Sequence, residues 1–254
     1  MTATGFEPRT PHTCEPFADA RGVAVGLARL DEEGEPLDAA ERVLSKDELA
    51  RAARFRFERD RDAFVRARAF LRRTLGSALL QDPKALEFLV GPFGKPALAN
   101  ARGLEFNLSH SGALALCAHA WGRPVGVDVE EHRAGVEGLD VAELFFTPRE
   151  IETLRALPEE ERAHGFFLCW TRKEAYVKAR GEGLSISLAG FHVSCTPGAP
   201  ATIVGVGDAA PEVARWSIAN LDVGPGYSAA VAAYGNGWSL EALSALPVDS
   251  DSFS

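Results

Sequence analysis

The stretch Val125-Gly126-Val127-Asp128-Val129-Glu130 alternates between valines and small or acidic residues. Such a period of two is typical of a β-strand, in which successive side chains point to opposite faces of the sheet. The three valines therefore share one face, and Asp128 and Glu130 share the other face with Gly126. Two carboxylates beside a residue without a side chain form an open oxygen-ligand site for a hard cation, and Mg²⁺ is the natural candidate. A solvent-facing polar edge would give the same alternation.

A helical stretch further along the chain supplies another carboxylate and a cation. The sequence from Trp170 to Lys178 reads WTRKEAYVK, and it lies within a helix expected over 159–180, with Gly181 as the C-terminal cap. Glu174 and Lys178 are four residues apart and share one helical face. The functional interpretation gives this face a metal-binding or basic carboxylate and a phosphate-binding ammonium. The alternative is an ordinary helix-stabilising ion pair.

Hydrogen-bond donors cluster after the strand expected over 104–108. The run Asn107-Leu108-Ser109-His110-Ser111 places several of them at one strand end, where hydroxyl and imidazole groups suit phosphate oxygens. The loop lysine of Gly94-Lys95-Pro96 is similarly placed to reach a fixed phosphate. A nucleophilic Ser–His pair is a rival interpretation, but sequence neighbours rarely have triad geometry, and no Gly-x-Ser-x-Gly elbow occurs. A turn with local side-chain-to-backbone bonds is the other alternative.

Arginines are concentrated in one segment of the chain. Residues 51–73 contain nine of the 27 lysines and arginines. Because guanidinium groups match phosphate oxygens, this segment predicts a site for a polyanionic ligand. A solvated helix face with Glu58, Asp60 and Asp62 as salt-bridge partners is the alternative.

The overall composition excludes several classes of protein. The chain has 254 residues, is 46% hydrophobic and carries a net charge of −9. These values rule out a disordered chain or a fibre and disfavour a nucleic-acid partner. No stretch reaches the ~18 apolar residues of a membrane span, and the N-terminus lacks a signal-peptide core, so we expect no membrane partner. Four scattered cysteines without a CxxC pair predict a cytoplasmic protein without disulfides or a zinc site.

The expected elements form two groups of strands and helices, which predicts an α+β fold with two similar halves. We place the N-terminal half at 1–122, the C-terminal half with the metal and catalytic residues at 123–239, and a frayed tail at 240–254. A hairpin-like turn over 121–124 leaves little room for a linker, so the halves should pack tightly. The expected elements are strands 23–30, 86–90, 104–108, 113–120, 125–130, 191–195, 202–206, 216–223 and 227–234, and helices that begin near Lys46 and Pro148 or span 60–80 and 159–180.

The order of these motifs resembles the 4′-phosphopantetheinyl transferases of the Sfp type, in the Gsp/Sfp/HetI/AcpT superfamily. The resemblance runs from about Ser45 to Tyr234 and is most specific at Gly-Val-Asp-Val-Glu and Trp-x-x-Lys-Glu-x-x-x-Lys. It implies a monomer of two α+β subdomains related by pseudo-twofold symmetry, with coenzyme A in the cleft between them. It also implies Mg-dependent transfer of 4′-phosphopantetheine from coenzyme A to a serine of an acyl or peptidyl carrier protein, with release of adenosine 3′,5′-bisphosphate. Such carriers serve fatty-acid, polyketide or nonribosomal-peptide synthesis.

The resemblance assigns roles to individual residues. Asp128, Glu130 and Glu174 look like ligands of Mg²⁺, with Mn²⁺ as an alternative metal. Glu174 also resembles the base for the incoming serine, directly or through water, and Lys178 resembles the residue that holds the pyrophosphate. The positions that match a grip on the 3′-phosphate, or a basic residue near the nucleotide, are Lys95, Ser109, His110 and Arg51.

Two positions depart from the family pattern. Glu48 and Phe64 stand where some members use a lysine and a threonine near the 3′-phosphate. Two rival functions come from other classes of protein: a catalytically silent protein that binds coenzyme A, and an RNA-binding module that uses the arginine segment. The intact metal and lysine positions argue against the first, and the lack of interleaved exposed aromatic residues argues against the second.

Overall fold

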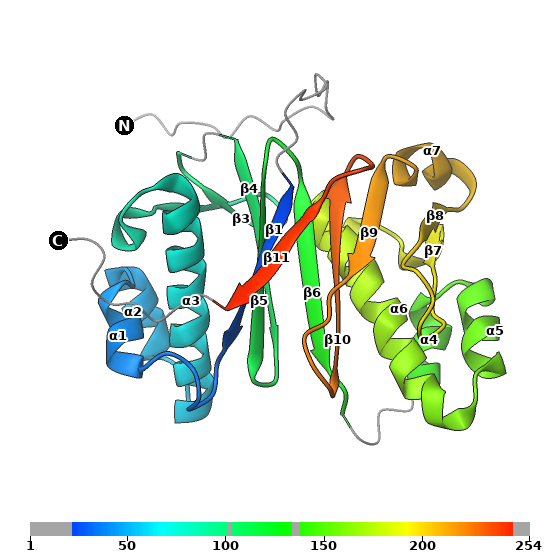
Figure 1. Ribbon diagram of the computed structural model, residues 1–254, viewed down its shortest axis with the longest axis horizontal. Helices are drawn as coiled ribbons and strands as arrows, with labels where there is room; N and C mark the ends of the chain where they lie inside the picture. Colours follow the sequence, from blue (N-terminus) through cyan, green and yellow to red (C-terminus); the bar gives the residue numbers. More distant parts are fainter. Residues whose placement is uncertain (1–21, 101–102, 134–137, 246–254) are drawn as a thin grey trace.

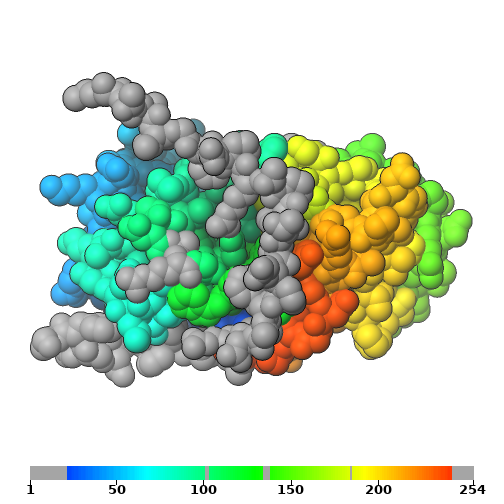
Figure 2. All heavy atoms as spheres, turned by 90° about the horizontal axis from the view of Figure 1, so that it is seen from above, coloured from blue at the N-terminus to red at the C-terminus, as the bar shows by residue number. Residues whose placement is uncertain are grey.

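Two sheets face each other in the centre of the molecule, and a long helix covers the outer side of each one (Figure 1). The computed structural model describes residues 22–100, 103–133 and 138–245. The first sheet has the strand order β11-β1-β5-β4, and the second has the order β6-β10-β9. Seen from above, the residues coloured blue and cyan and those coloured yellow and orange gather toward opposite ends of the molecule (Figure 2).

The first part of the chain builds most of the first sheet and the helices that cover it. Its elements are β1 (Val23–Arg29), α1 (Leu37–Arg42), α2 (Lys46–Ala52), α3 (Glu58–Leu79), β2 (Phe88–Val90), β3 (Pro96–Leu98), β4 (Leu104–Ser111) and β5 (Leu114–Trp121).

The second part builds the second sheet and its helices. Its elements are β6 (Val125–Glu131), α4 (Gly138–Phe145), α5 (Pro148–Ala156), α6 (Glu159–Arg180), β7 (Phe191–Val193), β8 (Ile203–Gly205), α7 (Ala210–Val213), β9 (Trp216–Asn220) and β10 (Tyr227–Tyr234). The last strand, β11 (Leu240–Ala245), joins the first sheet.

The sheets meet through a core that both of them line. The three valines of β6 are fully buried there, together with Leu116 of β5 and Val231 of β10. The period of two in β6 therefore has the predicted consequence: its valines face the other sheet, and Asp128 lies on the face that α6 covers. Outside each sheet a further core packs a helix onto the strands, as Leu71 of α3 packs with Phe106 of β4.

The two long helices have the predicted local determinants. In α3, Ala67, Leu71 and Leu75 are buried at four-residue steps. Helix α6 ends at Arg180, and Gly181 caps it with a φ of 70°. Both predicted capping boxes, at Ser45 and at residue 147, are present. The mixture of helices and sheets confirms the α+β class, and the pseudo-twofold symmetry stays a prediction.

Two expectations are wrong. The turn over 121–124 is not a hairpin, because β5 pairs with β1 and β4 whereas β6 pairs with β10. The Arg123 guanidinium donates to the carbonyl of Tyr234, and the Tyr234 amide donates to the carbonyl of Pro124. These bonds attach the turn to the second sheet, so it is a crossover between sheets.

The tail expected to fray from 240 begins with a strand. Residues 240–245 form β11, which runs parallel to β1 and pairs with it from Val23 to Leu27. An otherwise open sheet edge explains this ordering, because β1 offers unpaired backbone groups there. Residues 246–254 lie outside the described part of the chain. Since β11 returns to the first sheet, the division into halves at 122 and 123 stays a prediction.

Candidate active site

A buried aspartate forms the centre of the candidate site. The Asp128 side chain is 2% exposed. Its Oδ1 accepts hydrogen bonds from the Ser109 hydroxyl at 2.9 Å and from the Lys178 ammonium at 2.5 Å. Its Oδ2 is also buried and has no hydrogen-bond partner among the described residues. A buried carboxylate oxygen without a partner is costly, so this atom calls for a ligand.

Burial also changes the acidity of this carboxyl. Removal from water raises the pKa of Asp128 to about 7, and Lys178 partly opposes this shift. The pKa of Glu174 is raised as well, chiefly by burial and further by the charge of Glu130. Carboxyl groups with raised pKa values that share one cationic neighbour are typical of functional sites.

Two more carboxylates lie around this centre. Glu130 follows Asp128 on the same face of β6, and its Oε2 accepts a hydrogen bond from the Ser111 hydroxyl at 2.9 Å. Glu174 reaches the site from α6, one turn before Lys178, and its acidity responds to both Lys178 and Glu130. The structure therefore places Lys178 and Glu130 close enough to Asp128 and Glu174 to change the pKa of both carboxyl groups. The ligand atoms of Asp128, Glu130 and Glu174 do not all lie within 4.8 Å of one another, so their shared role as metal ligands stays a prediction.

Gly126 determines how near α6 lies to β6. A Cβ atom built at Gly126 would lie 2.2 Å from the amide nitrogen of Ala179 and 2.3 Å from the carbonyl of Ala175. Only a residue without a side chain allows this approach. The expectation that Gly126 leaves the ligand site open is therefore wrong, because its missing side chain makes room for the helix that carries Glu174 and Lys178.

These residues suit a hard divalent cation. The donors are carboxylate oxygens with a hydroxyl beside them, and the unpartnered Asp128 Oδ2 offers a ligand atom. Oxygen donors are what Mg²⁺ prefers. A tighter group of three possible ligand atoms, within 4.8 Å of one another, belongs to Glu150, Cys169 and Cys195. That group is already occupied, because Glu150 accepts bonds from Lys173 at 2.9 Å and from the Val193 amide.

The predicted phosphate-binding residues are only partly gathered here. Ser109 contacts Asp128 and Lys178. His110 lies close enough for the charge of Lys178 to lower its pKa, although burial lowers it more. The Lys95 ammonium instead donates to the carbonyls of Val125 and Ala179, each at 3.1 Å. Its burial lowers its pKa to about 8.

Arg51 lies outside this cluster of side chains. Its guanidinium stacks over the ring of Phe64, 5.1 Å from the centroid. The departures from the family pattern at Glu48 and Phe64 thus have local reasons. Glu48 closes the capping box of α2 and forms ion pairs with Arg68 and Arg72, at 2.5 and 2.6 Å.

Some arginines of the segment 51–73 anchor helix α3, and others are exposed to solvent. Arg66, Arg68, Arg72 and Arg73 tie α3 to carbonyls or to glutamates of neighbouring segments, so their partners are not the expected Glu58, Asp60 and Asp62. Arg59 pairs with Asp60, and Arg61 pairs with Asp62, as the alternative of a solvated helix face expected. The exposed members are Arg51, Arg54, Arg56 and Arg59. Exposed Phe55 and Phe57 lie among them, so the expected lack of interleaved aromatic residues is wrong for this segment.

Sequence reasoning missed two kinds of site residue. Ser111 gave no signal beyond its place in a polar run, and its hydroxyl holds Glu130. Lys173, which precedes Glu174 in the helical motif, is fully buried and pairs with Glu150. That pair fixes α6 against the start of α5, and only the spatial contact of residues 23 positions apart reveals it.

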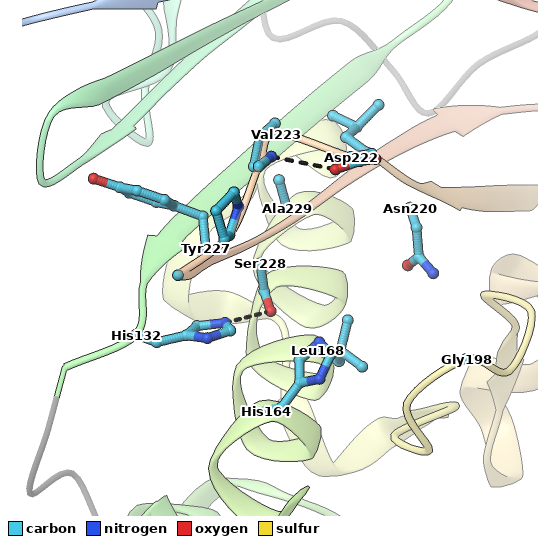
Figure 3. A pocket seen from close by; sticks show the side chains of 14 residues that line it. His132, His164, Leu168, Gly198, Asn220, Asp222, Val223, Tyr227, Ser228 and Ala229 are labelled. Carbon is cyan, nitrogen blue, oxygen red and sulfur yellow. Dashed lines mark hydrogen bonds between the residues drawn. The ribbon is translucent and has the colours of Figure 1, made fainter.

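Two cavities flank the second sheet. A cavity of about 260 Å³ adjoins Glu130 and is lined by Arg133, Val141, Phe166 and Trp170 among others. A larger one of about 790 Å³ lies beside β10 and the first half of α6 (Figure 3). There the ring of His132 meets the hydroxyl of Ser228 at 2.8 Å. Among the described helices, none is long and apolar enough to cross a membrane.

Comparisons with known proteins give a consistent result. A family model described as the 4′-phosphopantetheinyl transferase superfamily matches residues 124–232, and one described as 4′-phosphopantetheinyl transferase, N-terminal, matches residues 32–121. The chain is 41% identical over 212 residues to 4′-phosphopantetheinyl transferase HetI of Nostoc sp., covering 82% of this chain and 86% of that protein. It is 27% identical to 4′-phosphopantetheinyl transferase Sfp of Bacillus subtilis, covering 75% and 82%.

A solved structure is also similar in part. It is described as the Chronobacterium ammoniagenes ACPS-CoA complex, with 18% identity and a TM-score of 0.35. The similarity covers 44% of this chain and 95% of that one.

Proposed function

Because this chain belongs to the 4′-phosphopantetheinyl transferases, enzymes that transfer phosphopantetheine, we propose that its substrates are coenzyme A and a serine of an acyl or peptidyl carrier protein. The observation that carries this proposal is the buried Asp128. Its Oδ1 accepts a hydrogen bond from Lys178, and its Oδ2 has no partner among the described residues. The charges of Glu130 and Lys178 act on both Asp128 and Glu174. Clustered carboxylates and a lysine are the groups that phosphoryl transfer requires.

Asp128, Glu130 and Glu174 are the residues that would hold Mg²⁺, or Mn²⁺ in its place. When bound, the cation would neutralise the charge of the pyrophosphate and of the leaving group. Lys178 could also neutralise pyrophosphate charge, because its side chain is 29% exposed while its ammonium contacts Asp128. We propose that it transfers its hydrogen bonds from Asp128 and Ser109 to pyrophosphate oxygens.

Glu174 is proposed as the base. Its pKa is raised by burial, and a carboxylate with a raised pKa accepts a proton more readily. The serine hydroxyl of the carrier would attack the β-phosphorus of coenzyme A and pass its proton to Glu174, directly or through one water. The new bond joins the serine oxygen to that phosphorus. The bond between the β-phosphorus and the oxygen that bridges to the α-phosphate breaks. Adenosine 3′,5′-bisphosphate leaves with the electron pair of that bond.

The nucleotide end is proposed to lie in the cleft between the two halves, near His110 and Ser109. Lys95 would have to exchange its two carbonyl acceptors for the 3′-phosphate, and Arg51 would face the nucleotide from α2. We further propose a cytoplasmic monomer with two halves related by pseudo-twofold symmetry. A silent coenzyme A-binding protein is the alternative, and the complete set of acidic and basic site residues favours the enzyme.

A labelling assay tests this function. The purified chain is mixed with fluorescent coenzyme A and apo carrier proteins from fatty-acid, polyketide and peptide-synthetase systems, with Mg²⁺ or with EDTA. Mg-dependent transfer of the label to at least one carrier is expected. Binding of coenzyme A without labelling of any carrier would favour the silent binding protein.

A further inference from the structure

Strand β4 presents a polar side chain toward β6 at every second residue. Asn107 Oδ1 accepts a hydrogen bond from the amide of Val127 at 2.9 Å. Two residues later, the Ser109 hydroxyl donates to Asp128 Oδ1. After two more, Ser111 contacts both Glu130 and Glu131. Because side chains two residues apart lie on the same face of a strand, the two serines contact successive residues on the same face of β6.

These contacts join two strands that belong to different sheets. In the described part of the chain, β4 is an edge strand that pairs with β5, and β6 is an edge strand that pairs with β10. An edge strand leaves backbone amides without a ladder partner. Asn107 and Ser111 satisfy two such amides of β6 with side-chain oxygens, at residues 127 and 131. The contact between these two strands, the β4–β6 seam, therefore consists of side-chain hydrogen bonds rather than a backbone ladder.

Ser111 has the most defined geometry in this seam. Its Oγ accepts from the Glu131 amide at 3.1 Å and donates to Glu130 Oε2 at 2.9 Å. The backbone amide fixes where the oxygen lies, and the single hydroxyl proton is then directed at the carboxylate. Ser111 is 7% exposed, so water competes little for this bond. A glutamate that is held in this way loses rotamer freedom before any ligand arrives.

We propose that Ser111 is a positioning residue that holds the Glu130 carboxylate ready for a divalent cation, with the β4–β6 seam as its support. This inference rests on the proposed function, because it assumes that Glu130 is a metal ligand. It concerns a residue without an expected role in binding coenzyme A, unlike Ser109. Hydrogen bonds to ligating groups typically change metal affinity by about 10–100-fold when they are removed.

Ser228 provides a matched control. It lies opposite Glu130 in the register of β10 and β6, and it is 3% exposed. Its hydroxyl contacts the ring of His132 rather than a carboxylate (Figure 3). Ser228→Ala therefore removes a buried hydroxyl beside Glu130 without removing a bond to it.

The test is a titration of the metal-free full-length protein with Mn²⁺, followed by electron paramagnetic resonance. Ser111→Ala should weaken Mn²⁺ binding by about tenfold or more, whereas Ser228→Ala should bind like the wild type. In the transfer assay, Ser111→Ala should need more Mg²⁺ for half-maximal rate and regain most of its turnover at saturating Mg²⁺. Equal Mn²⁺ affinity of Ser111→Ala and wild type would overturn the proposal.

Two further outcomes are informative. If Ser111→Ala does not fold, Ser111→Cys keeps the shape with a weaker hydrogen bond, and wild-type Mn²⁺ affinity in that folded variant would overturn the proposal. If the wild type transfers phosphopantetheine and binds Mn²⁺ while Ser111→Ala also does so normally, only the positioning role is wrong. If the wild type neither binds Mn²⁺ nor transfers the group, the proposed function fails and the positioning role fails with it.

Discussion

Asp128 combines deep burial with an incomplete set of partners. One carboxylate oxygen has two hydrogen-bond donors, and the other has none among the described residues. Such an arrangement costs folding free energy, and a cost of this kind is typical of a residue that serves binding. The residue is therefore the most informative single position of the site.

Asp128→Asn should lower turnover by about 10²–10³-fold, because a neutral amide cannot replace a charged ligand of a hard cation. The shape of the side chain is kept, so the melting temperature should stay near that of the wild type. Transfer rates at limiting Mg²⁺ and thermal unfolding measure the two effects. Near-normal turnover at limiting Mg²⁺ would remove Asp128 from the metal site.

The buried ammonium of Lys95 predicts a pH-dependent stability. Its pKa is lowered to about 8, so between about pH 8 and the ordinary lysine pKa the unfolded chain binds more protons than the folded one. Stability from this group therefore rises with pH in that window. The free energy of unfolding of the wild type, relative to Lys95→Met, should increase by about 2 kcal/mol between pH 7 and pH 10. A constant difference across this range would mean that the ammonium is not buried.

For single residues, the periodicity of the sequence predicted which face a side chain lies on, but not which distant residues it contacts. The alternation in β6 and the four-residue spacing of Glu174 and Lys178 place carboxylates and cation on defined faces. The partners of Lys95 lie 30 and 84 positions away in the sequence. No local pattern encodes such contacts, so the carbonyl acceptors of Lys95 could not be predicted.

Among the elements, the pair of β6 and α6 determines the site. Asp128 and Glu130 lie on the strand, Glu174 and Lys178 lie on the helix, and Gly126 allows the two backbones to approach. A shift of α6 away from β6 would therefore separate Glu174 and Lys178 from the proposed metal ligands Asp128 and Glu130.

Gly126→Ala should destabilise the fold by about 3 kcal/mol, because the new methyl group would overlap backbone atoms of α6 that cannot move aside individually. Transfer activity should fall as well, since Glu174 and Lys178 move with the helix. Urea unfolding and the transfer rate measure both effects. Gly190→Ala is the control, because a Cβ there has only ordinary contacts, at 3.9 and 4.0 Å. Equal stability of the two variants would contradict the close packing.

Element boundaries could be predicted where local chemistry sets them. The capping boxes before α2 and α5, the apolar stripe of α3 and the glycine after α6 all act within a few residues. The crossover at 121–124 and strand β11 could not be predicted, because strand pairing depends on which sheet edge is open. A tight turn between two apolar strands gives the same sequence pattern whether or not those strands pair, so the pattern predicts a hairpin in both cases.

For the whole molecule, the surface near the site suggests where a carrier protein docks. Phe146 is 4% exposed and stacks on Phe166, whereas Phe145 is 44% exposed and meets Trp170 edge-on. Trp170 also lines the cavity beside Glu130. Of the two adjacent aromatics, the buried one belongs to the core and the exposed one is available to a partner.

Phe145→Ser should raise the KM for the carrier by about fivefold or more, because an exposed aromatic side chain near a binding site commonly contributes to affinity. The KM for coenzyme A and the melting temperature should stay unchanged. Phe146→Ser is the contrasting variant and should lower the melting temperature, since it removes a buried ring. An unchanged carrier KM in Phe145→Ser would place the docking surface elsewhere.

The proposed transfer reaction is tested most directly by the intact mass of an apo carrier protein after incubation with coenzyme A, Mg²⁺ and this chain. The wild type should add one phosphopantetheine group to the carrier and release adenosine 3′,5′-bisphosphate in equal amount. Glu174→Gln, with a folded structure and unchanged melting temperature, should leave the carrier mass unaltered over the same time. A wild type that modifies none of the fatty-acid, polyketide and peptide-synthetase carriers, or a Glu174→Gln variant that modifies them at the wild-type rate, would contradict the proposed site and its chemistry.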